Sequence, residues 1–390
     1  MYPDLSYFFF DLFGTAPDNW LSVFKTFGVL LIISFLVSAY FLKRELIRKE
    51  NEGLLKGSIE KIKTGYPATW QEIAQNALFG FIIGWKLPYI IQHFDAFRPD
   101  PAAILLSGKG TILWGIIGAA VFGFLRYWDQ HKKQIGKPQI KEVLVMPHQR
   151  IGDITILAAI SGLAGARLFS IIESEENIKA FIQDPLDQLL SGSGLAIYGG
   201  LILAFIVVYI YIKSKGMKPI HVMDAVAPAL IMGYAVGRIG CQLSGDGDWG
   251  IVNASASPSW WFLPQWAWSY DYPHNVLNDG IQIEGCMWEY CRHLSEGVFP
   301  TPLYETFFSL IIFGILWSLR KRIRIAGIIF FLYVFLNGVE RFFIEKIRTN
   351  PDITVFGIEA TQAEYIAFLL IVIGIVGMIL CYLRRGPARN

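Results

Sequence analysis

The sequence predicts an all-α, polytopic integral membrane helix bundle with about nine transmembrane helices. Hydrophobic residues make up 54% of the 390 residues and charged residues only 17%, whereas a soluble domain carries about a quarter of charged residues. Two uncharged stretches, 191–212 and 365–383, reach the length of about 18 to 20 residues that a helix needs to cross a bilayer. This composition excludes a disordered chain, and a net charge of only +2 gives no argument for a nucleic-acid partner.

Shorter apolar runs supply the remaining predicted helices. The stretch 26–42 is just short of the spanning length, and six more uncharged runs end in Lys, Arg or Glu. Helix ends in membrane bundles carry such charges when the side chains snorkel or have a function. These six helices are predicted near 73–94, 111–127, 152–172, 221–240, 303–319 and 324–345. We therefore expect one membrane domain over residues 1–390.

The positions of Lys and Arg predict the topology, because loops rich in both residues tend to stay cytoplasmic. The segments 43–63 and 126–150 are strongly basic, and 173–187 is mostly acidic. Alternating the loops through nine spans places the N-terminus outside and the C-terminus in the cytoplasm. The first span can act as an uncleaved insertion signal, because 1–18 lacks the basic start of a cleavable signal peptide.

The largest polar insert, 241–300, lies on the extracytoplasmic side in this topology. It contains half of the chain's 12 Trp, and Trp favours the headgroup layer of a membrane. We therefore expect a Trp-rich insert that lies on the membrane surface. Cys286 and Cys291 face an oxidising compartment and could form a local disulfide or remain free thiols.

Two stretches of the chain resemble each other, which suggests an internal repeat. Residues 84–91 align with 165–172, and Lys86 matches Arg167 in this alignment. A Gly-x-Gly at 108–110 then aligns with one at 192–194. We therefore expect 70–130 to be an inserted helical hairpin. It is either a repeat of 151–215 or a chance match, because Gly and Ile are common in membrane helices. Repeats are also common in transporters, which keeps that class open.

Arg238 lies at the outer end of a predicted helix, immediately before a glycine-rich segment. Glycines follow at 240, 245, 247 and 250, and glycine lets backbone N–H groups approach a ligand closely. An anion could therefore bind beside the guanidinium group. The alternative is that Arg238 snorkels to the outer headgroups and the glycines only end the helix.

Arg341, Glu345 and Arg348 are spaced i, i+4 and i+7, which places them on one helical face. Glu345 can orient one guanidinium group and leave the other free for a phosphate; the alternative is a surface ion-pair ladder. Arg167 and Lys86 also lie near outer helix ends, so the cations of this leaflet suggest a phospholipid headgroup as ligand. Cys and His are too scattered for a zinc or haem site, so we expect no metal and no cofactor.

Several blocks of residues, in this order, resemble the bacterial phosphatidylglycerol:prolipoprotein diacylglyceryl transferase family, which puts a diacylglyceryl group on the lipobox cysteine of lipoprotein precursors. The blocks are Gly165-Ala-Arg167-Leu168, Asp184-Pro185-Leu186, Tyr198-Gly199-Gly200-Leu201-Ile202, Asp224-Ala-Val-Ala227-Pro228, Gly237-Arg238-Ile239-Gly240, Pro300-Thr301-Pro302-Leu303-Tyr304-Glu305 and Arg341-Phe-Phe-Ile-Glu345-Lys-Ile-Arg348. With a weaker match in the first span, they cover 20–45 and 150–385. The chain thus resembles a divergent member with an inserted hairpin.

The resemblance implies a seven-helix core in the bacterial cytoplasmic (inner) membrane, with an active site toward the outer leaflet. The implied partners are phosphatidylglycerol as donor, prolipoprotein signal peptides with a lipobox cysteine, and the lipid bilayer. The implied catalytic residues are Arg238, Arg341, Glu345 and Tyr198. The implied substrate-binding residues are Arg238, Arg167, Arg348, Gly199, Gly200, Gly240 and Glu305.

The chain also departs from the family pattern. The family's His before Gly-Gly-Leu-Ile is Tyr198, its Tyr before the first-span Gly is Phe27, and its Asn after the key Arg is Cys241. The family's His and Gln around Pro-x-x-Leu-Tyr-Glu are Phe299 and Pro302. One extra residue also separates the key Arg from the next Trp-Gly pair.

These departures bear on mechanism. A thioether requires a thiolate, whose formation from a free Cys near pH 7 costs about 2 kcal/mol, and glycerol phosphate must leave. We hypothesise that Arg238 and Arg341 bind the phosphate and stabilise the leaving group, while Glu345 orients Arg341. With Tyr198 in place of His, the base lies elsewhere or the cationic field activates the thiol. A non-catalytic relative that binds phospholipid or lipoprotein precursors stays open as well.

Overall fold

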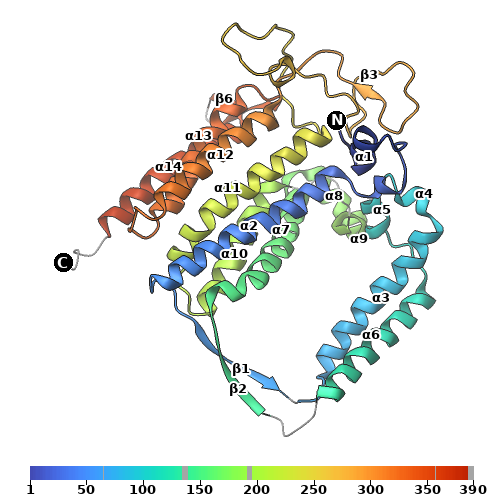
Figure 1. Cartoon of the computed structure of the whole chain (residues 1–390), viewed down its shortest axis with the longest axis vertical. Coiled ribbons are helices and arrows are strands. Elements are labelled where there is room, and N and C mark those ends of the chain that lie inside the picture. Colours follow the sequence, from blue (N-terminus) through green and yellow to red (C-terminus); the bar gives the residue numbers. More distant parts are fainter. Residues whose placement is uncertain (65, 134–138, 191–195, 356, 385–390) are drawn as a thin grey trace. The chain divides into compact units, whose positions relative to one another are not determined.

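The computed structural model of the chain describes residues 1–64, 66–133, 139–190, 196–355 and 357–384 (Figure 1). The chain divides into two compact units. The first consists of Met1–Leu55 and Met217–Asn390, and the second is Lys56–Gly216. Helices predominate in both units, as the sequence predicts.

The first unit is a bundle of long helices. Its helices are α1 (Leu5–Phe13), α2 (Thr26–Asn51), α11 (Pro219–Ser244), α12 (Thr301–Leu319), α13 (Ile328–Glu345) and α14 (Gln362–Leu383). Its strands form two antiparallel hairpins, β3 (Ile281–Gln282) with β4 (Arg292–His293) and β5 (Asp352–Val355) with β6 (Ile358–Thr361). Short 3-10 turns cover Trp20–Val23 and Gln265–Ala267.

Helix α11 contacts three other helices of this unit, α2, α12 and α13. The buried aliphatic core formed with α12 and α13 comprises Ala227, Ile231, Ile312, Leu316 and Ile329. On the α2 side, the Ser34 hydroxyl donates a hydrogen bond of 2.7 Å to the carbonyl oxygen of Gly233. Small residues let membrane helices approach this closely. Packing on several faces therefore fixes the C-terminal part of α11, which carries Arg238.

The second unit contains two helical hairpins of the same design. In chain order it comprises β1 (Ser58–Thr64), α3 (Trp70–Gln92), α4 (Phe94–Phe97), α5 (Pro101–Leu106), α6 (Ile112–Lys133), β2 (Gln139–Val145), a 3-10 turn (Pro147–Arg150), α7 (Ile151–Glu173), α8 (Glu175–Gln183), α9 (Pro185–Leu190) and α10 (Ile197–Ser214). In each hairpin a long helix is followed by two short helices and a second long helix. The strands β1 and β2 pair antiparallel.

Glycines bring the long helices of each hairpin into backbone contact. A Cβ atom on Gly84 of α3 would overlap the carbonyl group of Trp114 in α6. A Cβ atom on Gly165 of α7 would lie 2.5 Å from the carbonyl oxygen of Gly199 in α10. Gly84 and Gly165 are equivalent in the sequence alignment of the two stretches, so the same close approach occurs twice.

The aligned cations are also bound alike. Lys86 donates to the carbonyl oxygens of Ile104, at 2.9 Å, and of Ser107. Arg167 donates through Nε to the carbonyl oxygen of Gln188. The separation along the chain is 21 residues both for Lys86 and Ser107 and for Arg167 and Gln188. Both side chains are buried. Lys86 therefore stabilises the turn of its own hairpin, and its role as a headgroup ligand at the outer leaflet stays a prediction.

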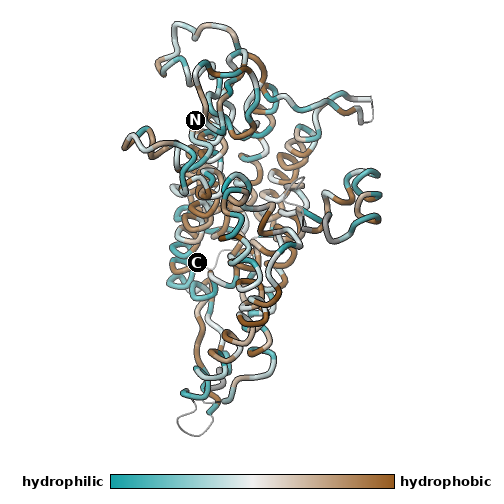
Figure 2. Tube along the Cα trace, turned by 90° about the vertical axis from the view of Figure 1, so that its right-hand side faces the viewer, coloured by the Kyte–Doolittle hydropathy of each residue, from teal (hydrophilic) through white to brown (hydrophobic). Residues whose placement is uncertain are grey.

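The predicted membrane spans agree with the helices. Each predicted span overlaps one helix of the described part of the chain, and six of these helices are long and apolar enough to cross a membrane. These six are Thr26–Asn51, Ile112–Lys132, Pro147–Glu173, Pro219–Ser244, Thr301–Leu319 and Gln362–Leu383. Apolar residues run along the long helices and hydrophilic ones gather in the connecting segments (Figure 2). The structure thus confirms a multi-pass helix bundle.

Some boundaries differ from the prediction. Helix α2 continues to Asn51, beyond the predicted end at 42, because Lys and Arg are good helix formers outside the bilayer. The predicted basic loops 43–63 and 126–150 contain the paired strands β1 and β2, which an all-α assignment misses. The helix predicted over 191–212 begins at Ile197, and 191–195, with the glycines at 192 and 194, lie outside the described residues.

The glycine contact in the second hairpin can be tested with Gly165→Ala. We expect this variant to lose about 1–3 kcal/mol of stability, because the new methyl group has to push the backbone of α10 away. Gly162→Ala is the matched control, since its Cβ would meet Ala204 at an ordinary 3.8 Å. Thermal unfolding in detergent measures both variants, and equal melting temperatures would contradict the proposed packing.

Candidate active site

Glu305, in the second turn of α12, lies at the centre of the most highly charged cluster of the first unit. Its side chain is fully buried, and three arginines from different parts of the chain surround its carboxylate. Arg238 Nε of α11 lies 2.6 Å from Oε2, Arg341 Nη1 of α13 lies 3.0 Å from Oε1, and Arg348 Nη1 lies 3.5 Å from Oε1. A buried carboxylate is stable only when cations and hydrogen bonds compensate its charge. Glu305 therefore fixes the three guanidinium groups around one small volume.

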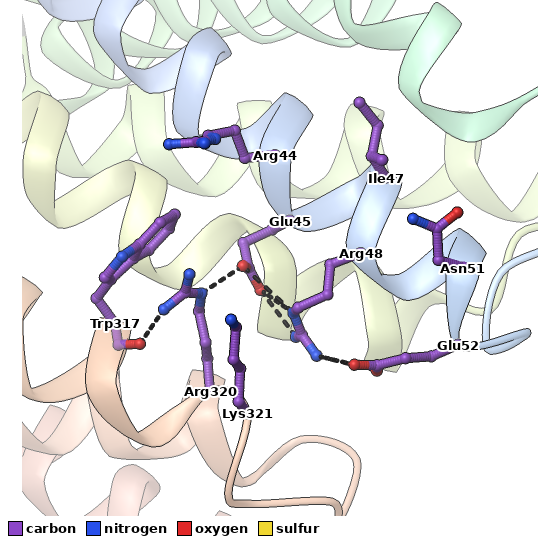
Figure 3. A pocket seen from close by; sticks show the side chains of 9 residues that line it. All are labelled: Arg44, Glu45, Ile47, Arg48, Asn51, Glu52, Trp317, Arg320 and Lys321. Atoms are coloured by element: carbon purple, nitrogen blue, oxygen red, sulfur yellow. Dashed lines mark hydrogen bonds and ion pairs between the residues drawn. The ribbon is translucent and has the colours of Figure 1, made fainter.

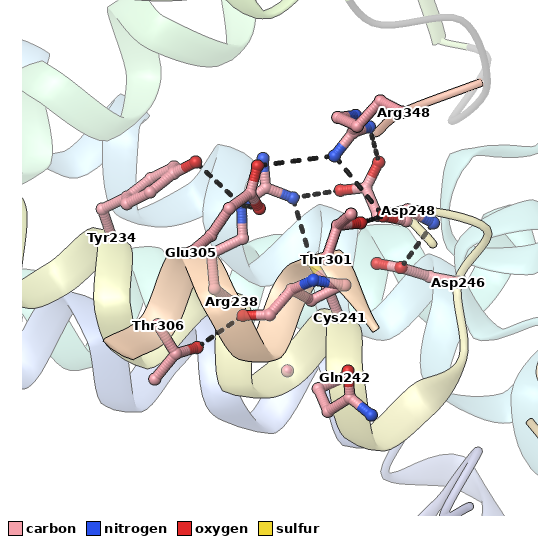
Figure 4. A network of polar contacts seen from close by, with 12 residues as sticks. Tyr234, Arg238, Cys241, Gln242, Asp246, Asp248, Thr301, Glu305, Thr306 and Arg348 are labelled. Carbon is pink, nitrogen blue, oxygen red and sulfur yellow. Dashed lines mark hydrogen bonds and ion pairs between the residues drawn. The ribbon is translucent and has the colours of Figure 1, made fainter. Parts of the chain in front are cut away.

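Asp248 is a second carboxylate of the cluster (Figure 4). It forms ion pairs with Arg238 and, at 2.6 Å, with Nη2 of Arg348. Its main-chain carbonyl accepts a hydrogen bond of 2.5 Å from the Thr301 hydroxyl at the start of α12. Burial alone would raise the pKa of Asp248, but the two guanidinium groups outweigh burial and lower it to about 2. Asp248 is therefore ionised throughout the physiological range.

The segment after α11 turns back to bring Asp248 to Arg238. Gly245 ends the helix with φ of 63°, a left-handed conformation that favours glycine. The Gly250 N–H then donates to the carbonyl oxygen of Phe299, and the Ile251 N–H donates to that of Ile347, both at 2.8 Å. A side chain at 250 would collide with the Ile347 backbone. This segment is thus held between the start of α12 and the end of α13.

Arg341 and Glu345 form the ion pair that their i, i+4 spacing predicts, with Nη2 2.9 Å from Oε2. The other oxygen of Glu345 accepts hydrogen bonds from Asn350 Nδ2 at 2.6 Å and from the Thr361 hydroxyl at 2.8 Å. Because Glu345 is buried and held from two further sides, it can orient the Arg341 side chain rigidly.

Arg238 also has contacts other than its ion pairs with Glu305 and Asp248. Its Nε donates to the Tyr234 hydroxyl at 3.0 Å, and its guanidinium carbon lies 5.0 Å from the centre of the Tyr234 ring. Nη1 lies 3.7 Å from the Cys241 sulfur. A guanidinium group in such an environment cannot snorkel freely, so the headgroup-anchor alternative for Arg238 is wrong.

The charges of the cluster balance, which the sequence did not predict. Three arginines face three carboxylates, namely Asp248, Glu305 and Glu345. The expectation that one guanidinium group is free for a phosphate is therefore wrong, because the second arginine of the motif, Arg348, pairs with Asp248. An anionic ligand has to compete with carboxylates that are already in place.

Other predicted site residues lie elsewhere. Gly240 faces α2, where its Cβ would meet Leu30 at 3.3 Å, so it allows helix packing. Tyr198 and Gly199 begin α10 of the second unit, and Arg167 is bound within its own hairpin. Gly200, also in α10, packs against the α7 backbone. The first unit therefore brings together Arg238, Glu305, Arg341, Glu345 and Arg348.

Two acidic residues of this region, Asp248 and Glu340, are not among the site residues that the sequence predicted. Asp248 gives a weak signal, because acidic residues are common in glycine-rich turns. Glu340 gives a stronger one, since it is a carboxylate inside an apolar span. Its side chain is buried, and neither carboxylate oxygen has a hydrogen-bond partner among the described residues. Cys241, Asp246 and Asp248 lie close enough to hold a cation, but the arginines on Asp248 disfavour a metal there.

The ion pairs of Asp248 predict a pH-dependent stability. Because its pKa in the folded protein lies below the value of about 3.9 in an unfolded chain, Asp248 stabilises the fold above pH 4, and this contribution is lost as the pH falls toward 2. Asp248→Asn should therefore lower the melting temperature at pH 7, and the difference from the parent protein should shrink between pH 4 and 2.

Asp246→Asn is the matched control for that series. Burial and the charge of Asp248 raise the pKa of Asp246, so its ionised form costs stability at neutral pH. The Asn variant should melt at the parent temperature or above it at pH 7. Equal losses from both substitutions would contradict the assignment of the ion pairs to Asp248.

Comparison with known proteins identifies the family. The sequence model described as prolipoprotein diacylglyceryl transferase matches residues 121–380. The chain is 30% identical to the phosphatidylglycerol--prolipoprotein diacylglyceryl transferase of Staphylococcus xylosus, over 72% of this chain and 89% of that protein. The enzyme of the same name from Corynebacterium diphtheriae is 29% identical, over 76% of this chain and 97% of that protein. The chain therefore belongs to the prolipoprotein diacylglyceryl transferase family.

Proposed function

We propose that this protein transfers the diacylglyceryl group of phosphatidylglycerol to the lipobox cysteine of prolipoproteins. The names of its relatives support this activity. The observation that carries it here is the pairing of Arg238 and Arg341, from two separate helices, with the single carboxylate of Glu305. Two guanidinium groups thus face one small volume, which is the arrangement that binding of one phosphodiester requires.

The reaction places charge where the arginines can stabilise it. The thiol loses its proton, the sulfur attacks the diacylglyceryl carbon, and the bond from that carbon to the phosphate oxygen breaks. Glycerol phosphate leaves with the electron pair of that bond. Arg341 has five N–H donors and uses Nη1 and Nη2 toward Glu305 and Glu345. Its remaining donors and those of Arg238 can bind the leaving phosphate.

The carboxylates keep the arginines in place before the lipid arrives. Glu305 and Glu345 are buried and hold Arg238 and Arg341 from the protein side. Asp248 is more exposed, with 34% of its side chain accessible, and lies in a loop. We infer that Asp248 is the carboxylate that the phosphate displaces, because moving it requires no change in a helix.

We propose that Tyr198, which stands where the family has His, contacts the substrate together with Arg167, Gly199 and Gly200. The motif matches Gly165-Ala-Arg167-Leu168 and Tyr198-Gly199-Gly200-Leu201-Ile202 support this proposal. Since Tyr is a poor base at neutral pH, activation of the thiol by the cationic field is part of this proposal.

We also propose the finer topology: nine spans, the N-terminus outside, the C-terminus in the cytoplasm, and the arginine cluster toward the outer leaflet of the bacterial inner membrane. This topology is supported by the Lys and Arg residues at 43–49, near the C-terminal end of α2, and at 320–324, after the C-terminal end of α12. Glu305 of the arginine cluster lies near the other end of α12. The insert 241–300, with its Cys286–Cys291 disulfide, suits an oxidising compartment. Its exposed Trp260 and Phe262 suit a membrane surface.

We propose further that the inserted hairpin 70–130 is a repeat of 151–215. The support is twofold: equivalent glycines bring the helices into contact in both hairpins, and equivalent cations bind carbonyl oxygens 21 residues further on. The family match begins only at residue 121, so most of this hairpin lies outside it.

A non-catalytic phospholipid-binding relative is the second candidate. The observation that favours it is the balanced charge of the arginine cluster together with Tyr198 in place of His. Such a protein would bind phosphatidylglycerol but form no thioether on a lipobox peptide, which mass spectrometry distinguishes directly.

Arg238→Ala should lower thioether formation by about 100- to 1,000-fold, because it removes a preorganised donor to the leaving group and leaves Glu305 uncompensated. The measurement is mass spectrometry of a lipobox peptide after incubation with the purified protein and phosphatidylglycerol. Arg126→Ala is the control, since Arg126 pairs with Glu72 inside the inserted hairpin at 2.8 Å. A parent protein that yields no thioether would favour the binding function.

Substitution of Tyr198 tests the thiol-activation proposal. We expect Tyr198→Phe to lower kcat at least about tenfold if the hydroxyl takes part in proton transfer. Tyr198→His should give a kcat equal to or higher than that of the parent protein. It should also introduce an ionisation near pH 6.5 in the pH–rate profile. A Phe variant with the parental kcat would remove Tyr198 from the catalytic residues and leave activation to the arginines.

A further inference from the structure

Two adjoining cavities, the larger one widely open, lie between the C-terminal end of α2 and the end of α12, far from the end of α12 that carries Glu305. The larger, of about 600 Å³, is lined by the end of α2 and the residue after it, and by the end of α12 and the two residues after it: Arg44, Glu45, Ile47, Arg48, Asn51, Glu52, Trp317, Arg320 and Lys321. The smaller, of about 350 Å³, extends toward α11 and α13 and shares Arg48, Glu52, Arg320 and Lys321 with it. On α11, Asp224 of the smaller cavity lies about 20 Å along the helix from Arg238. These cavities are therefore separate from the candidate active site.

Cations outnumber acids in the walls of these cavities. The cationic lining residues are Arg44, Arg48, Lys49, Arg320, Lys321 and Arg324, and the acidic ones are Glu45, Glu52 and Asp224. Six positive charges against three negative ones leave a net charge of three positive. The arginine cluster at the other end is balanced, so the surplus of positive charge is particular to this end of the bundle.

A buried carboxylate positions two of the cations. Glu45 is only 1% exposed and pairs with Arg48 Nη2 at 2.8 Å and with Arg320 Nε at 2.6 Å (Figure 3). Arg48 also pairs with Glu52 at 2.7 Å. The guanidinium group of Arg320 stacks on the Trp317 ring, with its carbon 3.3 Å from the ring centre. Two guanidinium groups are therefore fixed beside the cavity without a ligand.

Lys49 pairs with Asp224 at 3.8 Å, but three other cations of the wall have no acidic partner among the described residues. In the part of the chain that the structure describes, neither Lys321 nor Arg324 forms an ion pair, and both are exposed. The guanidinium carbon of Arg44 lies 5.5 Å from the centre of the Tyr40 ring. Figure 3 shows the Lys321 side chain directed along that of Arg320 toward the carboxylate of Glu45. An anion in the cavity would supply the missing charge.

We propose that the two adjoining cavities together form a second anion site, which binds a phosphate group carried by the headgroup of an anionic phospholipid. Paired guanidinium groups match the geometry of phosphate oxygens, and the volume accommodates a headgroup. Basic clusters at the ends of membrane helices attract anionic lipids, and Trp317 is of the type found at the headgroup layer. A soluble phosphate ester offers the same chemistry, and the experiment separates the two sources.

The test is native mass spectrometry of the full-length protein released from bilayer nanodiscs of phosphatidylcholine with and without phosphatidylserine. The parent protein should retain bound phosphatidylserine. Lys321→Ala/Arg324→Ala should retain about one molecule fewer, or bind it about tenfold more weakly, because two charged donors are lost. Arg322→Ala is the matched control, since Arg322 is an exposed cation of the same turn that does not line either cavity.

A second arm identifies the source of the phosphate. In nanodiscs of phosphatidylcholine alone, inorganic phosphate should leave the melting temperature unchanged if the ligand is a lipid. A rise in the parent protein that Lys321→Ala/Arg324→Ala abolishes would assign the cavity to a soluble phosphate instead. If the double variant does not fold, Arg44→Ala, in an exposed side chain, takes its place. Equal lipid retention in parent, variant and control, with no effect of phosphate, would overturn the proposal.

Discussion

The buried carboxylate of Glu305 is the interaction on which the geometry of the candidate site depends. It binds arginines from α11, α13 and the segment after α13, so one side chain of α12 determines how three other segments meet. Without its negative charge, the three guanidinium groups would repel one another in a region with little water. Because ion pairs in such surroundings are strongly directional, the cluster is preorganised, and little reorganisation is needed when charge develops on a leaving group.

The sequence predicted those parts of the fold and site that depend on local spacing. Uncharged runs located the helices, because a bilayer imposes a minimum apolar length. The Arg341–Glu345 pair followed from their separation along one helix. The disulfide between Cys286 and Cys291 was one of two alternatives, and the structure forms it. The strands β1 and β2 were missed, because their charged residues have no apolar alternation that would mark a buried strand.

The remaining parts of the site depend on contacts between distant segments, which spacing does not reveal. Glu305 was expected to touch substrate, but its position among three arginines is set by the packing of α12 against α11 and α13. Asp248 reaches Arg238 only because the chain turns at Gly245 and is then held between Phe299 and Ile347. The wrong expectation of a free guanidinium group has the same cause, since the partner of Arg348 lies 100 residues away in the sequence.

The balanced charge of the cluster has a consequence for selectivity. A small soluble phosphate offers its charge and its hydrogen-bond acceptors, and at a site without surplus positive charge it gains little by replacing a carboxylate that offers the same. A diacyl lipid adds the burial of its hydrocarbon tails, at about 0.8 kcal/mol for each methylene removed from water. Such a site would still bind membrane-borne donors in the presence of free phosphate, and hydrophobic anchoring, not Coulomb attraction, would decide which molecules bind.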